Sequence, residues 1–263
     1  MRRYWAEYRT TEYAEIDPEK TIAILPTAAI EQHGPHLPVG VDTMINEGML
    51  ARLVSRAPRD LDFRILPVQA VGKSNEHLHA PGTLTLGADV AMRAWIDIGL
   101  SVARAGVRKL VIVNSHGGNL DMLGIICREL RVQAGMLAVK CQWGAFGHPE
   151  GMFSARELAY GIHGGDVETS LMLKFKPELV DMAQAETFPS SAEGMGNFKH
   201  LRPTGAAAYG WIASDLNAAG TVGDAAAATA EKGAAVCDHQ VEGFVEMLRD
   251  VEAFDLSRLG WSA

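Results

Sequence analysis

The chain has 263 residues, of which 48% are hydrophobic and 21% are charged, and its formal net charge is −8. This composition is typical of a globular protein that can bury a large core. The acidic excess disfavours a nucleic acid or a membrane surface as partner. Arg2 and Arg3 are not followed by an apolar run, so we expect no signal peptide. No apolar stretch reaches the ~18 residues of a transmembrane helix, so none is expected.

The cysteines do not form a structural framework. Cys127, Cys141 and Cys237 are odd in number, far apart and in no CxxC arrangement. They therefore predict reduced thiols in a cytoplasmic protein, rather than disulfides or a cysteine-based zinc site.

The first part of the chain alternates β-prone runs with amphipathic helices. Residues 21–25 predict a strand, 42–56 a helix with its apolar side chains on one face, and 63–68 a second strand. A polar loop at 72–82 then leads to a long helix at 88–105.

The middle of the chain continues this alternation. Residues 109–113 form a nearly continuous apolar run, which is typical of a parallel strand buried on both faces. A helix is predicted at 120–133 and a further strand at 136–143. The repeated order of strand, loop and helix predicts an α/β fold, with a mainly parallel central sheet between two helical layers (three-layer α/β/α).

The last third is less regular. Residues 171–175 show a helical pattern, and 188–201 are expected to be a surface loop. Asp224 is expected to cap the N-terminus of a long helix that reaches Leu248. Because no Pro/Ser-rich linker divides the chain, we expect a single domain over 1–263.

The loop after the first predicted strand is rich in metal-binding side chains. It holds Glu31, His33, His36 and Asp42, and glycines and prolines exclude a regular helix or strand there. Oxygen and imidazole donors on a stiff loop predict a divalent metal site, with an ordinary polar loop as the alternative.

Further donors follow later elements. His116 comes directly after the buried strand, and His163 and Glu168 lie on a glycine-bounded segment. In open α/β sheets, ligands bind outside the carboxyl ends of the strands. We therefore expect these distant loops to converge on one site.

Several motifs resemble those of one protein family. The loop that begins Glu31-Gln32-His33-Gly34-Pro35-His36-Leu37-Pro38, with Asp42-Thr43 behind it, resembles the metal-binding signature of the creatininase (creatinine amidohydrolase) family. Weaker motifs follow in the same order, over about residues 22 to 233: Pro81-Gly82-Thr83, Asn114-Ser115-His116-Gly117-Gly118-Asn119, His163 with Glu168-Thr169-Ser170, and Gly223-Asp224 with 227–233.

The resemblance implies a creatininase-like fold with a binuclear metal site. Carried over by position, Glu31 and His116 would bind one metal, His33 would bind the other, and Asp42 would bridge them. Creatininase proper has a glutamate where this chain has Gly118. The chain thus resembles the family's Gly-Gly variants, and creatinine is in doubt as its substrate. Glu168 is the expected replacement for the missing carboxylate.

The implied cofactors are two divalent metal ions. Mixed oxygen and nitrogen donors suit zinc or manganese, with iron as an alternative. Two such ions ~3.5–4 Å apart convert a bridging water to hydroxide near neutral pH. His163 is then the expected proton donor for a leaving nitrogen, with a loop-bracing role as its alternative. Glu168 is expected to be a ligand and to take part in catalysis, with a favourable helix N-terminal charge as its alternative.

Other residues are assigned by their position near these loops. Substrate contacts are expected from Ser74, Glu76, His77, Gly117 and Gly118, with a solvated turn as the alternative for the first three. The two glycines could offer backbone N–H groups to a carbonyl or anion. The remaining expectations are that His36 hydrogen-bonds a ligand, that His79 is structural, and that Asn114 and Asn119 brace the His116 loop. Trp143 and Trp211 are expected to pack in the core, with the wall of a pocket as the alternative.

The sequence thus predicts a metal-dependent amidohydrolase that cleaves a non-peptide C–N bond, in a cyclic amide, lactam or formamide. The alternatives are a metallopeptidase-like maturase of a small peptide, creatinine amidohydrolase itself, and a catalytically silent binding protein. A Ser-His-Asp hydrolase is disfavoured because no G-x-S-x-G motif is present. The resemblance also implies a homo-oligomer, with a hexamer among the expected forms, acting on a small-molecule amide.

Overall fold

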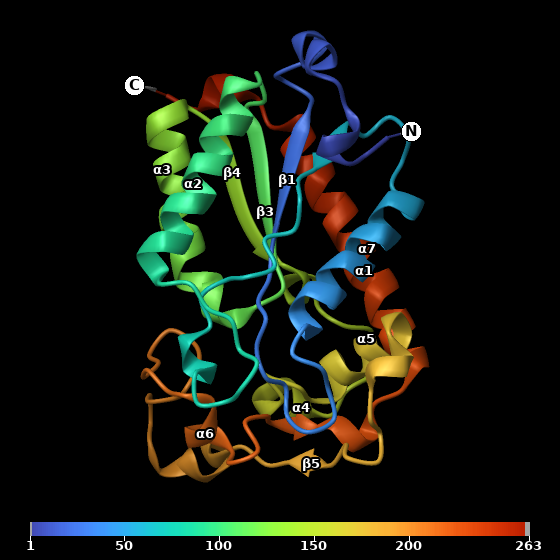
Figure 1. The fold of residues 1–263 in the computed structure, drawn as a ribbon, viewed down its shortest axis with the longest axis vertical. Coiled ribbons are helices and arrows are strands. Elements are labelled where there is room, and N and C mark those ends of the chain that lie inside the picture. The colour runs from blue at the N-terminus through green and yellow to red at the C-terminus, as the bar shows by residue number, and fades with distance from the viewer. Residues whose placement is uncertain (1, 261–263) are drawn as a thin grey trace.

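The computed structural model describes residues 2–260 and has a parallel sheet at its centre (Figure 1). The strands β1 (Ile22–Thr27), β2 (Phe63–Ile65), β3 (Lys109–Asn114) and β4 (Leu137–Gln142) lie in the order β2-β1-β3-β4, and every neighbouring pair is parallel. The predicted mainly parallel sheet is confirmed.

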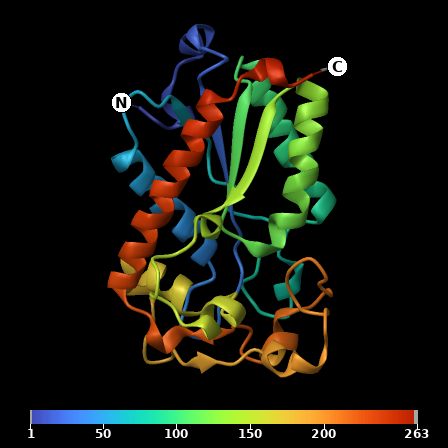
Figure 2. The same cartoon turned by 180° about the vertical axis from the view of Figure 1, so that it is seen from behind.

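Helices cover both faces of this sheet (Figures 1 and 2). One layer holds α1 (Val41–Arg56), α5 (Asp166–Phe175) and α7 (Ala230–Ala253), and the other holds α2 (Ala88–Arg104) and α3 (Leu120–Ala134). This is the predicted three-layer α/β/α arrangement.

Short elements complete the described chain. They are α4 (Ala155–Tyr160), α6 (Ala213–Leu216), the antiparallel pair β5 (Thr187–Phe188) and β6 (Gly223–Asp224), and the 3₁₀ turns η1 (Trp5–Glu7), η2 (Thr10–Glu15), η3 (Asn75–His77), η4 (Gly117–Asn119), η5 (Trp143–Phe146), η6 (Pro177–Leu179), η7 (Ser191–Asn197), η8 (Ala225–Ala227) and η9 (Leu256–Arg258). Within residues 2–260, no helix is long and apolar enough to cross a bilayer.

Each face of the sheet has its own hydrophobic core. Along β1, Ile22 and Ile24 pack into the core under α1, α5 and α7, whereas Ala23 and Leu25 pack into the core under α2 and α3. Every residue of β1 and β3 is buried. Because successive side chains of a strand point to opposite faces, burial on both faces requires the continuous apolar runs seen in the sequence.

One expectation for the last third is wrong, and a second holds only in part. Asp224 lies in β6, where its backbone N–H donates to a Glu157 oxygen at 2.8 Å, and does not cap the long helix. That cap is Thr229, whose side chain accepts a hydrogen bond from the backbone N–H of Lys232. The segment 188–201 is only partly a loop, because it contains the 3₁₀ turn η7 after a Ser190 cap. Because β6 pairs with β5, Asp224 lies in a strand, and α7 begins only at Ala230.

The short elements gather where the chain leaves the carboxyl ends of the strands. In Figure 1, α4, α6 and β5 lie at the same end of the molecule as the loops that follow β1 and β3. His163 forms an isolated antiparallel bridge with Val222, which ties the segment before α5 to the segment before β6. These short elements lie at the end of the sheet where the predicted metal-binding loops meet.

Candidate metal centre

Donors from distant segments converge on one buried cluster. Glu31 and His33 follow β1, Asp42 lies in the first turn of α1, His116 follows β3, and Glu168 lies in the first turn of α5. The first four are almost fully buried, with exposed fractions of at most 4%, whereas 24% of the Glu168 side chain is exposed. The structure thus brings together all five predicted ligands.

Two groups of potential ligands share Asp42. In one, Nδ1 of His116 lies 3.2 Å from Oε2 of Glu31 and 3.4 Å from Oδ2 of Asp42. In the other, Nε2 of His33 lies 3.5 Å from Oδ1 of Asp42 and 3.8 Å from Oε2 of Glu168. Each oxygen of Asp42 therefore faces a different set of donors.

Hydrogen bonds orient both imidazole rings for metal binding. Nδ1 of His33 donates to the carbonyl oxygen of Glu31 (3.0 Å), and Nε2 of His116 donates to that of Lys73 (2.8 Å), since a carbonyl can only accept. The remaining nitrogen of each ring then faces carboxylate oxygens. Nε2 of His33 and Oδ2 of Asp42 are buried without a hydrogen-bond partner. Such orphaned acceptors are expected where a cation binds, so a pair of divalent metals fits these residues.

The pKa shifts of the predicted ligands reflect the close approach of carboxylates and imidazoles in the cluster. Burial lowers the pKa of His33, but the carboxylates of Asp42, Glu168 and Glu31 outweigh burial and raise this pKa to about 9. The same balance raises the pKa of His116 well above its usual value. Burial raises the pKa of Glu168 to about 7. The carboxylates of the cluster thus favour positive charge at the neighbouring imidazoles, which is the electrostatic environment that a cation-binding site requires.

His163 lies against the cluster as a neutral ring. Its Nε2 donates to the carbonyl oxygen of Gln32 (2.7 Å), so its bare Nδ1 faces Oε1 of Glu31 at 3.5 Å. The ring stacks between those of His33 and His77, with centroids 4.1 and 4.4 Å away. Burial, followed by the charge of His33, lowers the pKa of His163 to about 3. In this state His163 can accept a proton but has none to give at Nδ1.

Gln32 holds this arrangement in place and was missed in the sequence. Its side-chain nitrogen donates to Nδ1 of His77 (2.7 Å) and to the carbonyl of Gly220 (2.5 Å), while its side-chain oxygen accepts from the N–H of Gly34 (2.9 Å). His77 must then carry its proton on Nε2, which faces Glu31 at 3.5 Å. In the sequence, the only feature that points to a role for Gln32 is its position between the predicted ligands Glu31 and His33.

Several residues expected to contact substrate make hydrogen bonds or close contacts to the cluster. Ser74 is fully buried and donates to Oε2 of Glu31 (2.5 Å). Glu76 lies with Oε1 3.5 Å from Nε2 of His116, and its Oε2 accepts from the Lys73 ammonium at 2.7 Å. A Cβ on Gly118 would lie 2.0 Å from Oε1 of Glu76. The Glu76 carboxylate thus fills the space that a side chain at position 118 would need.

Other expectations have mixed outcomes. Asn114 and Asn119 do brace the His116 loop, because Asn114 donates to the carbonyl of His116 (2.5 Å) and accepts from Asn119 (3.0 Å). His36 lies within hydrogen-bond distance of the Gly164 carbonyl (3.0 Å) and stacks on Phe188, so it braces the loop before α5.

The remaining residues named in the sequence analysis differ in their exposure and packing. His79 and Gly117 are exposed at the surface. Trp143 packs in the core against Phe244 (4.8 Å between ring centroids), as expected. Trp211 is only half-buried and lines a surface pocket, so the expectation of core packing is wrong for this residue.

A second buried carboxylate, Glu157, holds the segment that carries His163 and Glu168. Its oxygens accept from the backbone N–H groups of Asp166 (2.7 Å) and Asp224 (2.8 Å), and only 4% of the residue is exposed. Glycines surround it: a Cβ at Gly161, Gly165 or Gly223 would lie 2.2, 2.3 or 2.9 Å from its carboxylate. Glu157 therefore fixes the N-terminus of α5 against β6.

We expect Glu157→Gln to destabilise the protein by about 1–3 kcal/mol, because the amide can accept at only one of these positions and leaves a buried N–H unpaired. Chemical denaturation measures this free energy of unfolding. Glu193→Gln is the control, since Glu193 pairs with Arg156 in solvent and should change stability by less than about 1 kcal/mol. Equal stability of the two variants would contradict the role of Glu157.

Comparisons with known proteins agree with this geometry. A family model described as creatinine amidohydrolase matches residues 6–248. The mycofactocin precursor peptide peptidase of Mycolicibacterium smegmatis is 29% identical over 232 residues, which cover 87% of this chain and 84% of that protein. The creatinine amidohydrolase of Pseudomonas putida is 28% identical over 262 residues, or 94% of each protein.

Solved structures give the same result. A manganese form of creatininase is 25% identical and superimposes with a TM-score of 0.76, covering 97% of this chain and all of that one. Fold and site thus define a metal-dependent hydrolase with a three-layer α/β/α fold. The chain belongs to the creatininase family.

Proposed function

We propose that this chain is a binuclear metal-dependent amidohydrolase that cleaves a C–N bond. The observation that carries the proposal is the position of Asp42, whose two oxygens face two separate donor groups. We assign Glu31, Asp42 and His116 to one metal and His33, Asp42 and Glu168 to the other.

The metals and the side chains would share the chemistry. Two divalent ions at this site would activate water as a nucleophile and polarise the amide carbonyl. Amide hydrolysis also needs a proton for the leaving nitrogen. We assign that transfer to His163, whose bare Nδ1 can take a proton from the attacking water and pass it to the nitrogen when the C–N bond breaks. The hydrogen bond from its Nε2 to Gln32 holds the ring in the required orientation.

Two classes of amide are candidates. A cyclic amide, lactam or formamide follows from the likeness to creatinine amidohydrolase. A peptide follows from the likeness to the mycofactocin precursor peptide peptidase, which is at least as strong in identity. We further propose zinc or manganese, with iron as an alternative, and a single-domain cytoplasmic protein that assembles as a homo-oligomer.

Elemental analysis of protein purified without chelator tests the metal centre directly. We expect about two divalent ions per chain, loss of amide hydrolysis after chelation, and recovery on adding zinc or manganese. A content of about one ion per chain or less would reject the binuclear assignment. A panel of small amides and short peptides, assayed with the reconstituted protein, then separates the two substrate classes.

A further inference from the structure

We propose that a pocket beside the metal centre binds an uncharged apolar side chain of a linear, peptide-like amide substrate. This inference rests on the proposed amidohydrolase function and narrows its substrate class. The pocket has a volume of about 440 Å³. It is lined by Lys73, Asn75, Glu76, Gly210, Trp211, Ile212 and Asp215.

The pocket adjoins the centre through two residues that also contact His116. Glu76 belongs to both, since it lines the pocket and places Oε1 3.5 Å from Nε2 of His116. Lys73 also belongs to both, because its carbonyl accepts from His116 while its side chain lines the pocket. A substrate whose scissile amide lies at the centre can therefore extend past Glu76 into this space.

The far wall comes from a distant segment of the chain. In Figures 1 and 2, the segment before α6 lies beside the loop that carries η3. Trp211 is anchored there, because its indole N–H donates to the carbonyl of Pro203 at 2.8 Å. Ile212 beside it is 44% exposed, although it is a large apolar side chain. The indole ring and Ile212 together offer a fixed apolar surface that a substrate side chain can cover.

The charged groups of the pocket are already paired with other protein groups. The Lys73 ammonium lies 2.7 Å from Oε2 of Glu76. Asp215 accepts from the backbone N–H of Ile212 at 2.9 Å, which caps α6. A charged substrate group would have to compete with these contacts, so the pocket favours a neutral apolar group.

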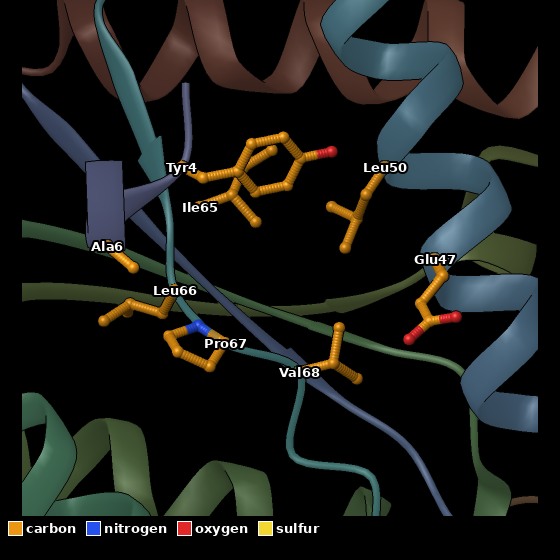
Figure 3. Close-up of a pocket in the computed structure, with 8 residues that line it drawn as sticks. All are labelled: Tyr4, Ala6, Glu47, Leu50, Ile65, Leu66, Pro67 and Val68. Carbon is orange, nitrogen blue, oxygen red and sulfur yellow. The ribbon is translucent and has the colours of Figure 1, made fainter. Parts of the chain in front are cut away.

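The volume of the pocket favours a linear amide that carries a side chain over a substrate that consists of a small ring alone. Ligand pockets range from roughly 300 to 1,000 Å³, so this volume is enough for a bulky side chain next to the reacting amide. A second pocket, of about 240 Å³ between Tyr4 and Leu50, shares no lining residue with the centre (Figure 3). It lies between β2 and α1 and cannot extend the active site.

The test compares peptide substrates that differ only in the residue beside the scissile bond. Metal-loaded protein is assayed with peptides carrying glycine, leucine, phenylalanine, lysine or glutamate at that residue, on either side of the bond. We expect kcat/KM to be roughly 10- to 100-fold higher for leucine and phenylalanine than for glycine. Trp211→Ala should remove this preference by raising KM for the apolar peptides, with little change for the glycine peptide.

Trp5→Ala is the matched control. Trp5 packs on Tyr13, with 4.6 Å between ring centroids, and lines neither the pocket nor the centre. This variant should keep the full preference. If Trp211→Ala also keeps it, or if the wild-type protein prefers charged residues or only small cyclic amides, the pocket proposal is wrong.

The same experiment separates failure of the pocket from failure of the function. Hydrolysis without side-chain preference would overturn the pocket and leave the amidohydrolase intact. If no amide is hydrolysed with two metals bound, the proposed function fails. Calorimetric titration of the same peptides then still decides the pocket, since tighter binding of apolar peptides, lost only in Trp211→Ala, would support it. Equal binding of all peptides would overturn it.

Discussion

Asp42→Asn should empty both metal positions at once and lower amide hydrolysis by about 10³-fold or more, the scale expected when a principal catalytic group is lost. Asparagine keeps the shape of Asp42 but removes its negative charge and one of its two acceptor oxygens. Both His33 and His116 face these oxygens, at 3.5 and 3.4 Å. Loss of the carboxylate therefore affects both donor groups.

Elemental analysis and activity, measured on the same preparation, check this result. Asp89→Asn is a matched control, because Asp89 also lies in the first turn of a long helix but is exposed to solvent. That variant should keep its metals and its activity. If Asp42→Asn retains one full equivalent of metal, Asp42 serves a single ion and the bridging assignment is wrong.

His163→Ala should keep both metals and lose about 10²- to 10⁴-fold in kcat, which is the usual contribution of a positioned acid–base group. The expected ligands do not include His163, and its Nδ1 lies free beside Glu31. Removing the ring therefore removes the proton carrier and leaves the proposed metal ligands in place.

The geometry also allows a different outcome for this variant. Glu31, His33 and His163 lie close enough for all three to hold one ion. If His163→Ala loses metal in proportion to activity, His163 is a ligand and the proton carrier must be sought elsewhere. His79→Ala is the control, because His79 is an exposed histidine of the same chain and should change neither quantity.

Local sequence signals were enough for the central layers of the fold. The apolar run of β3 and the amphipathic pattern of α1 are properties of consecutive residues, and each maps directly onto burial in the structure. Asp224 shows where this reasoning fails. It has the chemistry of a helix cap, but pairing of β6 with β5 and a hydrogen bond to Glu157 hold it in an extended segment.

The candidate site divides in a similar way. Four residues stand out in the sequence because carboxylate and imidazole groups that gather on loops after strands are typical of metal sites: Glu31, His33, Asp42 and His116. Glu157 and Gln32 do not stand out, since their roles depend on backbone groups distant in sequence, such as Asp224 and Gly220. No pattern of neighbouring residues encodes such contacts.

By itself, the sequence determined the α/β layering and the chemical types of the donors, because periodicity and residue type are local properties. Only the tertiary structure decided how these donors are used. It directs the two oxygens of Asp42 toward different partners, gives His163 a bare nitrogen, and places the Glu76 carboxylate over Gly118. It also places Trp211 in the same pocket as Glu76. These features depend on which distant segments meet, and therefore on the packing of the whole chain.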